Sequence, residues 1–196
     1  MWVFEEQKKR ALERLQRGGA DEEVEEVLQK INSLDEFFTT SSCSGRVALI
    51  CLPEIGAKRE ATFIGKWHRP VRKEEVLAAM SDAPSPRNGD IWLIAQSPIV
   101  HVACRSLEKA TALLRIAIEA GFKYSGIKAI SKDNGKVVVE IMSTERMDVP
   151  LATDDMMLCN EAHLDFIVSK ANFMLERSKE KLKRFCYRLK ELEKHL

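Results

Sequence analysis

The sequence predicts a mixed α/β (α+β) domain in which strands alternate with single helices and a long helix lies at each end. Apolar residues recur at helical spacing near both termini, whereas the middle holds short runs of β-branched and aromatic residues. Neither G-x-G-x-x-G after a strand nor a P-loop motif occurs, so no Rossmann fingerprint is expected. The 196 residues are 45% hydrophobic and 31% charged, which fits a single domain over residues 1–196.

The helices are predicted from apolar spacing and from the residues at their ends. Asp21 and Ser106 stand at N-cap positions, and Gly18 and Gly121 stand where helices stop. The expected helices span residues 4–18, 21–31, 72–80, 107–120 and about 160–192.

Runs rich in Val, Ile, Thr and Phe predict the strands. The polar residues 41–45 are expected to form a turn, and Asn134-Gly135 predicts a hairpin because both residues tolerate positive φ. The expected strands span residues 37–40, 47–52, 61–67, 91–95, 99–104, 127–131 and 137–142.

The last helix carries a seam of side chains at alternating steps of four and three, apolar except at Ser178. Such a seam keeps one face against a partner. The partner is either the helix at the other end of the chain or a second copy, so a monomer and a dimer both stay open. The seam positions are 164, 168, 171, 175, 178, 182, 185, 189 and 192.

Several classes of protein are not expected from composition. No apolar run approaches the roughly 20 residues that span a bilayer, and residues 1–10 lack the apolar core of a secretory signal. The five cysteines form no C-x-x-C pair and none lies beside a histidine at ligand spacing, so no metal site is expected. We therefore expect a cytoplasmic protein with no membrane attachment.

Residues 39–46 form the chain's densest group of hydrogen-bonding side chains, with four hydroxyls followed by Cys-Ser-Gly-Arg. Gly45 allows close backbone approach to a ligand, and Arg46 can grip a phosphate or carboxylate with two N–H groups. The alternative is a polar hairpin capped by its own hydroxyls. The candidate ligand-binding residues here are Thr40, Ser41, Ser42, Ser44, Gly45 and Arg46.

Other candidates lie farther along the chain. His101 interrupts an apolar strand, which suits either a satisfied core histidine or a proton acceptor at a cleft. Trp67 and His68 could stack a base and touch its phosphate. Ser143, Thr144 and the acid Glu145 follow a strand end, where functional groups are often exposed; a solvated loop is the alternative.

Between residues 58 and 73 six basic side chains accompany one carboxylate, although the whole chain has a net charge of only +1. Such a local excess suits phosphate binding, and a solvated surface is the plainer interpretation. The candidates for RNA phosphates are Lys58, Arg59, Lys66 and Arg69, together with Arg105.

Several segments, in the right order from about residue 35 to 186, resemble one family. Residues 39–46 resemble the F-T-T-S-S-C-x-G-R motif of the tRNA wybutosine-synthesising protein 3 family, the wyosine-derivative N4-methyltransferases. Residues 98–105 are similar to its F-x-x-H-V-x-C-R segment, and residues 121–127, with Ser125, to its G-F-R-x-S-G-I. Ser143-Thr144 and Val149-Pro150-Leu151 resemble its S-T and V-P-L.

The resemblance implies a compact fold unlike the Rossmann methyltransferases. It also implies S-adenosyl-L-methionine as cofactor and methyl transfer to N4 of the tricyclic guanosine beside the anticodon of tRNA-Phe. On this basis His101 or Glu145 is expected to be the base, and Ser41, Ser42, Ser125 and Thr144 to orient substrate or cofactor. The rival interpretations are a non-catalytic RNA-binding module in tRNA modification and an assembly protein joined through its long helix.

Overall fold

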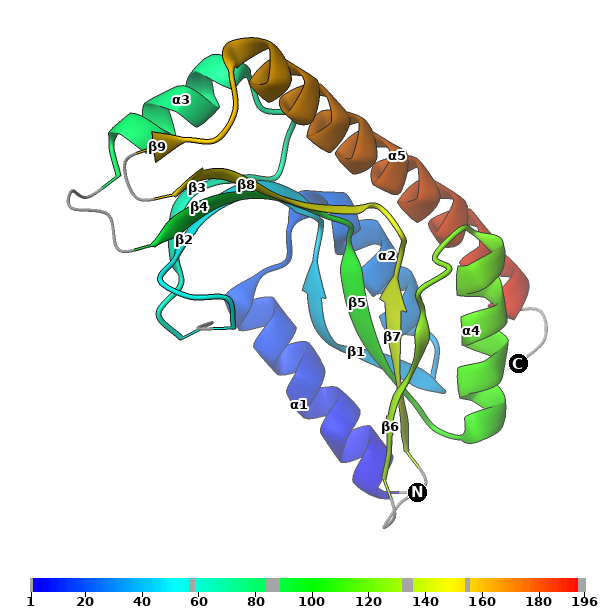
Figure 1. The fold of residues 1–196 in the computed structure, drawn as a ribbon. Coiled ribbons are helices and arrows are strands. Elements are labelled where there is room, and N and C mark those ends of the chain that lie inside the picture. Colours follow the sequence, from blue (N-terminus) through cyan, green and yellow to red (C-terminus); the bar gives the residue numbers. More distant parts are fainter. Residues whose placement is uncertain (1, 57–58, 84–88, 132–135, 154–155, 194–196) are drawn as a thin grey trace. The chain divides into compact units, whose positions relative to one another are not determined.

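The computed structural model describes residues 2–56, 59–83, 89–131, 136–153 and 156–193 (Figure 1). Lys58 and the Asn134-Gly135 turn lie outside these ranges. The chain divides into unit 1 (Met1–Ser44, Pro98–Thr144 and Ser178–Leu196) and unit 2 (Gly45–Ser97 and Glu145–Arg177). That the two units form one domain stays a prediction. No helix in the described ranges is both long enough and apolar enough to cross a membrane.

Unit 1 is built on a four-stranded antiparallel sheet of order β1-β5-β7-β6. Its main core lies between one sheet face and the helices α2, α4 and the second half of α5. Helix α1 packs on the other face through Phe4, Ala11, Phe38 and Ala103 (Figure 1). The elements are α1 (Trp2–Gly18), α2 (Glu22–Ser33), β1 (Phe37–Cys43), β5 (Ile99–Cys104), α4 (Leu107–Glu119), β6 (Gly126–Ile130), β7 (Val137–Met142) and part of α5 (Glu161–Glu193).

Unit 2 holds a five-stranded antiparallel sheet of order β3-β2-β4-β8-β9. Helix α3 and the first half of α5 supply the rest of its core, with Val76, Met80 and Leu164 among the buried side chains. The elements are β2 (Arg46–Leu52), β3 (Thr62–Trp67), α3 (Lys73–Ser81), β4 (Asp90–Gln96), β8 (Arg146–Thr153) and β9 (Met156–Met157).

The mixed α/β fold class with a long C-terminal helix is confirmed, whereas the structure differs from the local predictions at two places. The expected turn over residues 41–45 begins too early, because β1 continues to Cys43 through its pairing with β5. Strand β8 was not expected. Pro150 argues against a central strand. It stands opposite Trp92 of β4, but β9 pairs only with Ala152 and Thr153, so the other side of Pro150 is an edge of the sheet.

The structure also differs from the predictions for the cap of α2 and for the partner of the last helix. Asp21 stands at the N-cap of α2, but its carboxylate makes no cap hydrogen bond there and accepts the Ser44 backbone N–H at 2.8 Å. The seam of α5 is buried within this chain, with Leu164 and Leu175 in the core of unit 2 and Phe185 and Leu192 in that of unit 1. In unit 1 the second half of α5 and α1 lie on opposite sheet faces, so the pairing of the two terminal helices, one of the two alternatives for the seam, is wrong.

Candidate active site

A row of polar side chains crosses all four strands of the unit 1 sheet. Ser41 Oγ lies 2.9 Å from His101 Nδ1, and His101 Nε2 lies 2.8 Å from a carboxylate oxygen of Glu140. Lys128 Nζ donates to the other Glu140 oxygen at 3.0 Å. We call these four residues the polar row. They form a continuous hydrogen-bonded chain on the sheet face that also carries α1.

The strand register aligns the polar row. His101 of β5 stands opposite Ser41 of β1 on one side and Glu140 of β7 on the other. The pairing of β1 with β5 shifts between Thr39 and Ser41. In a regular strand Thr40 would stand opposite His101 and Ser41 would lie on the other face, because side chains alternate along a strand. The β-bulge therefore brings the Ser41 hydroxyl to the histidine.

Charge fixes the direction of these hydrogen bonds. The hydrogen bond from Lys128 lowers the pKa of Glu140 against the opposing effect of burial, and the hydrogen bond from His101 lowers it further. An ionised carboxylate only accepts, so the His101 proton stands on Nε2. In this tautomer the Nδ1 lone pair faces the Ser41 hydroxyl. Carboxylate, imidazole and hydroxyl in this order are the arrangement that lets a histidine take up a proton.

A hollow of about 280 Å³ lies beside this end of the row. It is bounded by α1 residues and by residues 39–42 of β1, so Thr40, Ser41 and Ser42 all line it. His101 is not part of its lining, and the His101 side chain is 26% exposed. Ser41 thus borders the hollow and also contacts the imidazole.

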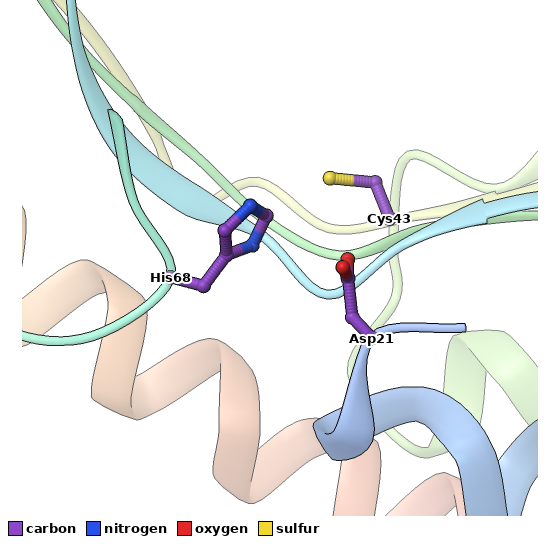
Figure 2. Close-up of side chains that lie close together, drawn as sticks. All are labelled: Asp21, Cys43 and His68. Atoms are coloured by element: carbon purple, nitrogen blue, oxygen red, sulfur yellow. The ribbon is translucent and has the colours of Figure 1, made fainter. Parts of the chain in front are cut away.

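The end of β1 is anchored rather than free. Ser44 is 1% exposed and donates its backbone N–H to Asp21, near which the Cys43 side chain lies (Figure 2). Ser44 is therefore buried, which argues against its predicted role in ligand binding. The Asp21 contact ties the hydroxyl-rich strand to the start of α2.

The remaining residues of the expected hydroxyl turn belong to unit 2. Gly45 has φ of 88°, and its carbonyl oxygen lies 3.0 Å from Nδ1 of His68, the third side chain in Figure 2. Arg46 donates to Gln96 at 3.1 Å, and its guanidinium lies 5.2 Å from the centre of the Phe63 ring. The half-buried Trp67 packs against the core of the unit.

The other predicted acid has a structural partner. Glu145 is 7% exposed, and its carboxylate accepts from Arg177 Nε at 3.1 Å. The expectation that residues 143–145 are exposed holds only for Thr144, because Ser143 is 1% exposed. Ser125 uses its hydroxyl to accept the Met142 backbone N–H at 3.1 Å, which fastens the segment before β6 to β7.

The predicted phosphate-binding residues fall into two groups. Arg59 and Lys66 are exposed. Arg69, in contrast, is paired with Glu75 at 2.6 Å, which with the Arg72 backbone N–H lowers the pKa of Glu75 to about 2. Arg105 contacts Glu5 at 2.7 Å and Glu36 at 3.1 Å and lies over the Phe4 ring, so it fastens α1 to the sheet.

Glu140 and Lys128 were missed by the sequence analysis. The alternation of β7 does place Glu140 on the face opposite to Val137, Val139 and Ile141, so its position away from the core was predictable. Which histidine that face meets depends on the pairing of β5 with β7, and the sequence gives no local signal for that register.

The chain is similar to one described family and to several of its members. The family described as Methyltransferase TYW3 matches residues 4–191. A tRNA(Phe) 7-((3-amino-3-carboxypropyl)-4-demethylwyosine(37)-N(4))-methyltransferase of Thermococcus sibiricus is 46% identical over 195 residues, covering 97% of this chain and 96% of the relative. A protein of Pyrococcus furiosus with the same description, numbered 1, is 48% identical over 185 residues, with 92% of each chain covered.

Solved structures agree with the sequence relatives. A protein from Pyrococcus horikoshii superposes with a TM-score of 0.87 at 45% identity, covering 95% of each chain. A protein from Aeropyrum pernix superposes with a TM-score of 0.75 at 32% identity, covering 88% of this chain and 98% of the other. The expected family resemblance is confirmed, and the chain belongs to the Methyltransferase TYW3 family.

Proposed function

We propose that this methyltransferase transfers a methyl group from S-adenosyl-L-methionine to N4 of 7-(3-amino-3-carboxypropyl)-4-demethylwyosine at position 37 of tRNA(Phe). The reaction is the one named for its relatives. The observation that carries it in this chain is the polar row, because N-methylation needs a group that removes a proton. We propose further that the protein works in the cytoplasm and that the reacting base lies in the anticodon loop.

The reaction is a displacement in which N4 attacks the methyl carbon of the cofactor. S-adenosyl-L-methionine supplies an electrophilic methyl group on a sulfonium sulfur. N4 forms the new bond to carbon while the carbon–sulfur bond breaks, its electron pair remaining on sulfur, and the N4 proton is released. The protein must align the two partners and accept the proton.

We assign proton removal to His101 acting through Ser41. Ser41 lines the hollow and lies 2.9 Å from Nδ1, so the N4 proton passes to the hydroxyl oxygen while the hydroxyl proton passes to the ring. Glu140 then stabilises the imidazolium from the other side. Glu145 is the weaker candidate base, because Arg177 already occupies its carboxylate.

The hydroxyl groups around the hollow fit a ligand rich in polar edges. Thr40 and Ser42 line it, and hydroxyls both donate to carboxylates and accept from sugar hydroxyls. We propose that these two residues orient the cofactor or the modified base. The exposed Thr144 of unit 1 is a further candidate for the same task, and the half-buried Arg46 is a candidate ligand-binding residue of unit 2. A base that reaches them must leave the stack of the anticodon loop.

The test is mass spectrometry of tRNA(Phe) that carries the 4-demethyl intermediate, after incubation with the protein and S-adenosyl-L-methionine labelled in its methyl group. We expect one labelled methyl on the tricyclic base and none in a reaction with unmodified tRNA. Tight tRNA binding without any methyl gain would overturn the proposal in favour of a non-catalytic RNA-binding module.

A further inference from the structure

Helix α1 carries a row of arginines that the sequence analysis did not single out. Arg10, Arg14 and Arg17 stand at steps of four and three, which places them on one helix face. All three are exposed. Together with Lys136 and Thr40 they line a hollow of about 460 Å³ in unit 1, in which Glu13 is the single carboxylate of the lining.

These cations are less neutralised than the predicted phosphate-binding arginines. Arg10 pairs with the exposed Glu6 at 3.0 Å. Arg14 and Arg17 each donate Nε to a backbone carbonyl of their own helix at 3.3 Å, and neither forms an ion pair within the described ranges. Arg69 and Arg105, by contrast, each hold a carboxylate within 2.7 Å. The positive charges of Arg14 and Arg17 on α1 are therefore available to bind an anion.

The arginine row borders the proposed reaction site. Arg14 lines both this hollow and the smaller one beside Ser41, and Thr40 is shared in the same way. From Arg10 to Arg17 the helix rises roughly 10 Å. That length exceeds one carboxylate group, so a single small anion would leave most of the row unused. An extended polyanion next to the reacting base matches it.

We propose that Arg10, Arg14, Arg17 and Lys136 bind the phosphates of the RNA strand that delivers its base to Ser41. This inference rests on the proposed function. Phosphate binding by several cations releases counterions, so affinity falls with salt at a slope near 0.7 to 0.9 per contact. Arginine suits the task because its fork of N–H groups matches phosphate oxygens.

The experiment compares two double variants of equal charge change. R14Q with R17Q removes two cations of the row, whereas R115Q with K123Q removes two exposed cations that line neither hollow. The affinity for tRNA(Phe) is measured at several salt concentrations, and that for S-adenosyl-L-methionine by calorimetry. Helical circular dichroism confirms that each variant is folded.

For R14Q with R17Q we expect tRNA affinity to fall by about tenfold or more and the salt slope to shrink by about 1.4 to 1.8. The affinity for S-adenosyl-L-methionine and the behaviour of the control variant should match the wild type. Unchanged tRNA affinity would overturn the inference. So would a loss confined to S-adenosyl-L-methionine, because the row would then hold the cofactor carboxylate. Wild-type protein that binds tRNA through this row but transfers no methyl would contradict the proposed function alone.

Discussion

Several polar side chains of the two units are used in different ways. In unit 1, Ser41, His101 and Glu140 contact one another along the hydrogen-bonding direction of the sheet, strand to strand. In unit 2, Glu145 contacts Arg177 and Lys73 contacts Asp165, so the pairs join the helix α5 to other elements of its unit. The unit 1 contacts align a hydroxyl, an imidazole and a carboxylate on one sheet face. The unit 2 contacts hold the helix α5 in place.

A buried carboxylate is by itself no sign of catalysis in this protein. Glu140 and Glu145 are both mostly buried and both paired with a cation. They differ in their remaining neighbour, which for Glu140 is an imidazole that continues to a hydroxyl beside a hollow. Loss of the first carboxylate should therefore affect rate, and disruption of the second pair should affect stability.

The largest effect is expected from H101Q. Glutamine can keep hydrogen bonds but cannot accept the proton, so methyl transfer should fall by about 10²- to 10⁴-fold. The exposed His163 gives the matched control, H163Q, which should retain wild-type rate. Single-turnover transfer of labelled methyl to tRNA measures both. Full activity of H101Q would remove the imidazole from the mechanism.

A smaller loss of rate is expected from E140Q, because the amide keeps the hydrogen bond to Nε2 but no longer balances the positive ring. We expect roughly a tenfold fall in kcat, below the range for loss of the base itself, with little change in KM for tRNA. The pH profile of kcat should also change, whereas a merely structural role would leave its shape as in the wild type.

Breaking the Glu145 pair should cost stability rather than rate. R177A leaves the buried Glu145 carboxylate without this partner, although Arg177 itself is 60% exposed, which weakens the pair. We expect a loss of about 1–3 kcal/mol in the free energy of unfolding in urea. R115A removes an exposed helix arginine as control. Equal stability of both variants would argue against a fastening role.

The smallest effect is expected on thermal stability, from loss of the ion pair between Arg69 and Glu75. The pKa of Glu75 is lowered to about 2, so the carboxylate binds its proton more weakly in the folded than in the unfolded protein. Its stabilisation is therefore complete above pH 4.5 and is lost as the pH falls toward 2. In E75Q the melting temperature should be slightly lower near neutral pH and should fall less steeply in acid. Parallel curves for both proteins would contradict this.

The site was only partly predictable. The run Thr40-Ser41-Ser42 and the lone histidine of an apolar strand both drew attention in the sequence, because polar groups in such places need a partner or a ligand. Glu140 did not, since a glutamate on an alternating strand is ordinary on a solvated face. The arginines of α1 were also overlooked, because they lie among acids of the same helix.

The sequence by itself determined the helices and most of the strands, the long terminal helix and the family. These follow from local periodicity, end signals and the order of motifs along the chain. Tertiary structure decided that Ser41 reaches His101. Side chains alternate along a strand, so one residue of register decides the face on which each lies. The bulge at Thr40 and the pairing of β5 with β7 set that register through contacts between segments far apart in the chain.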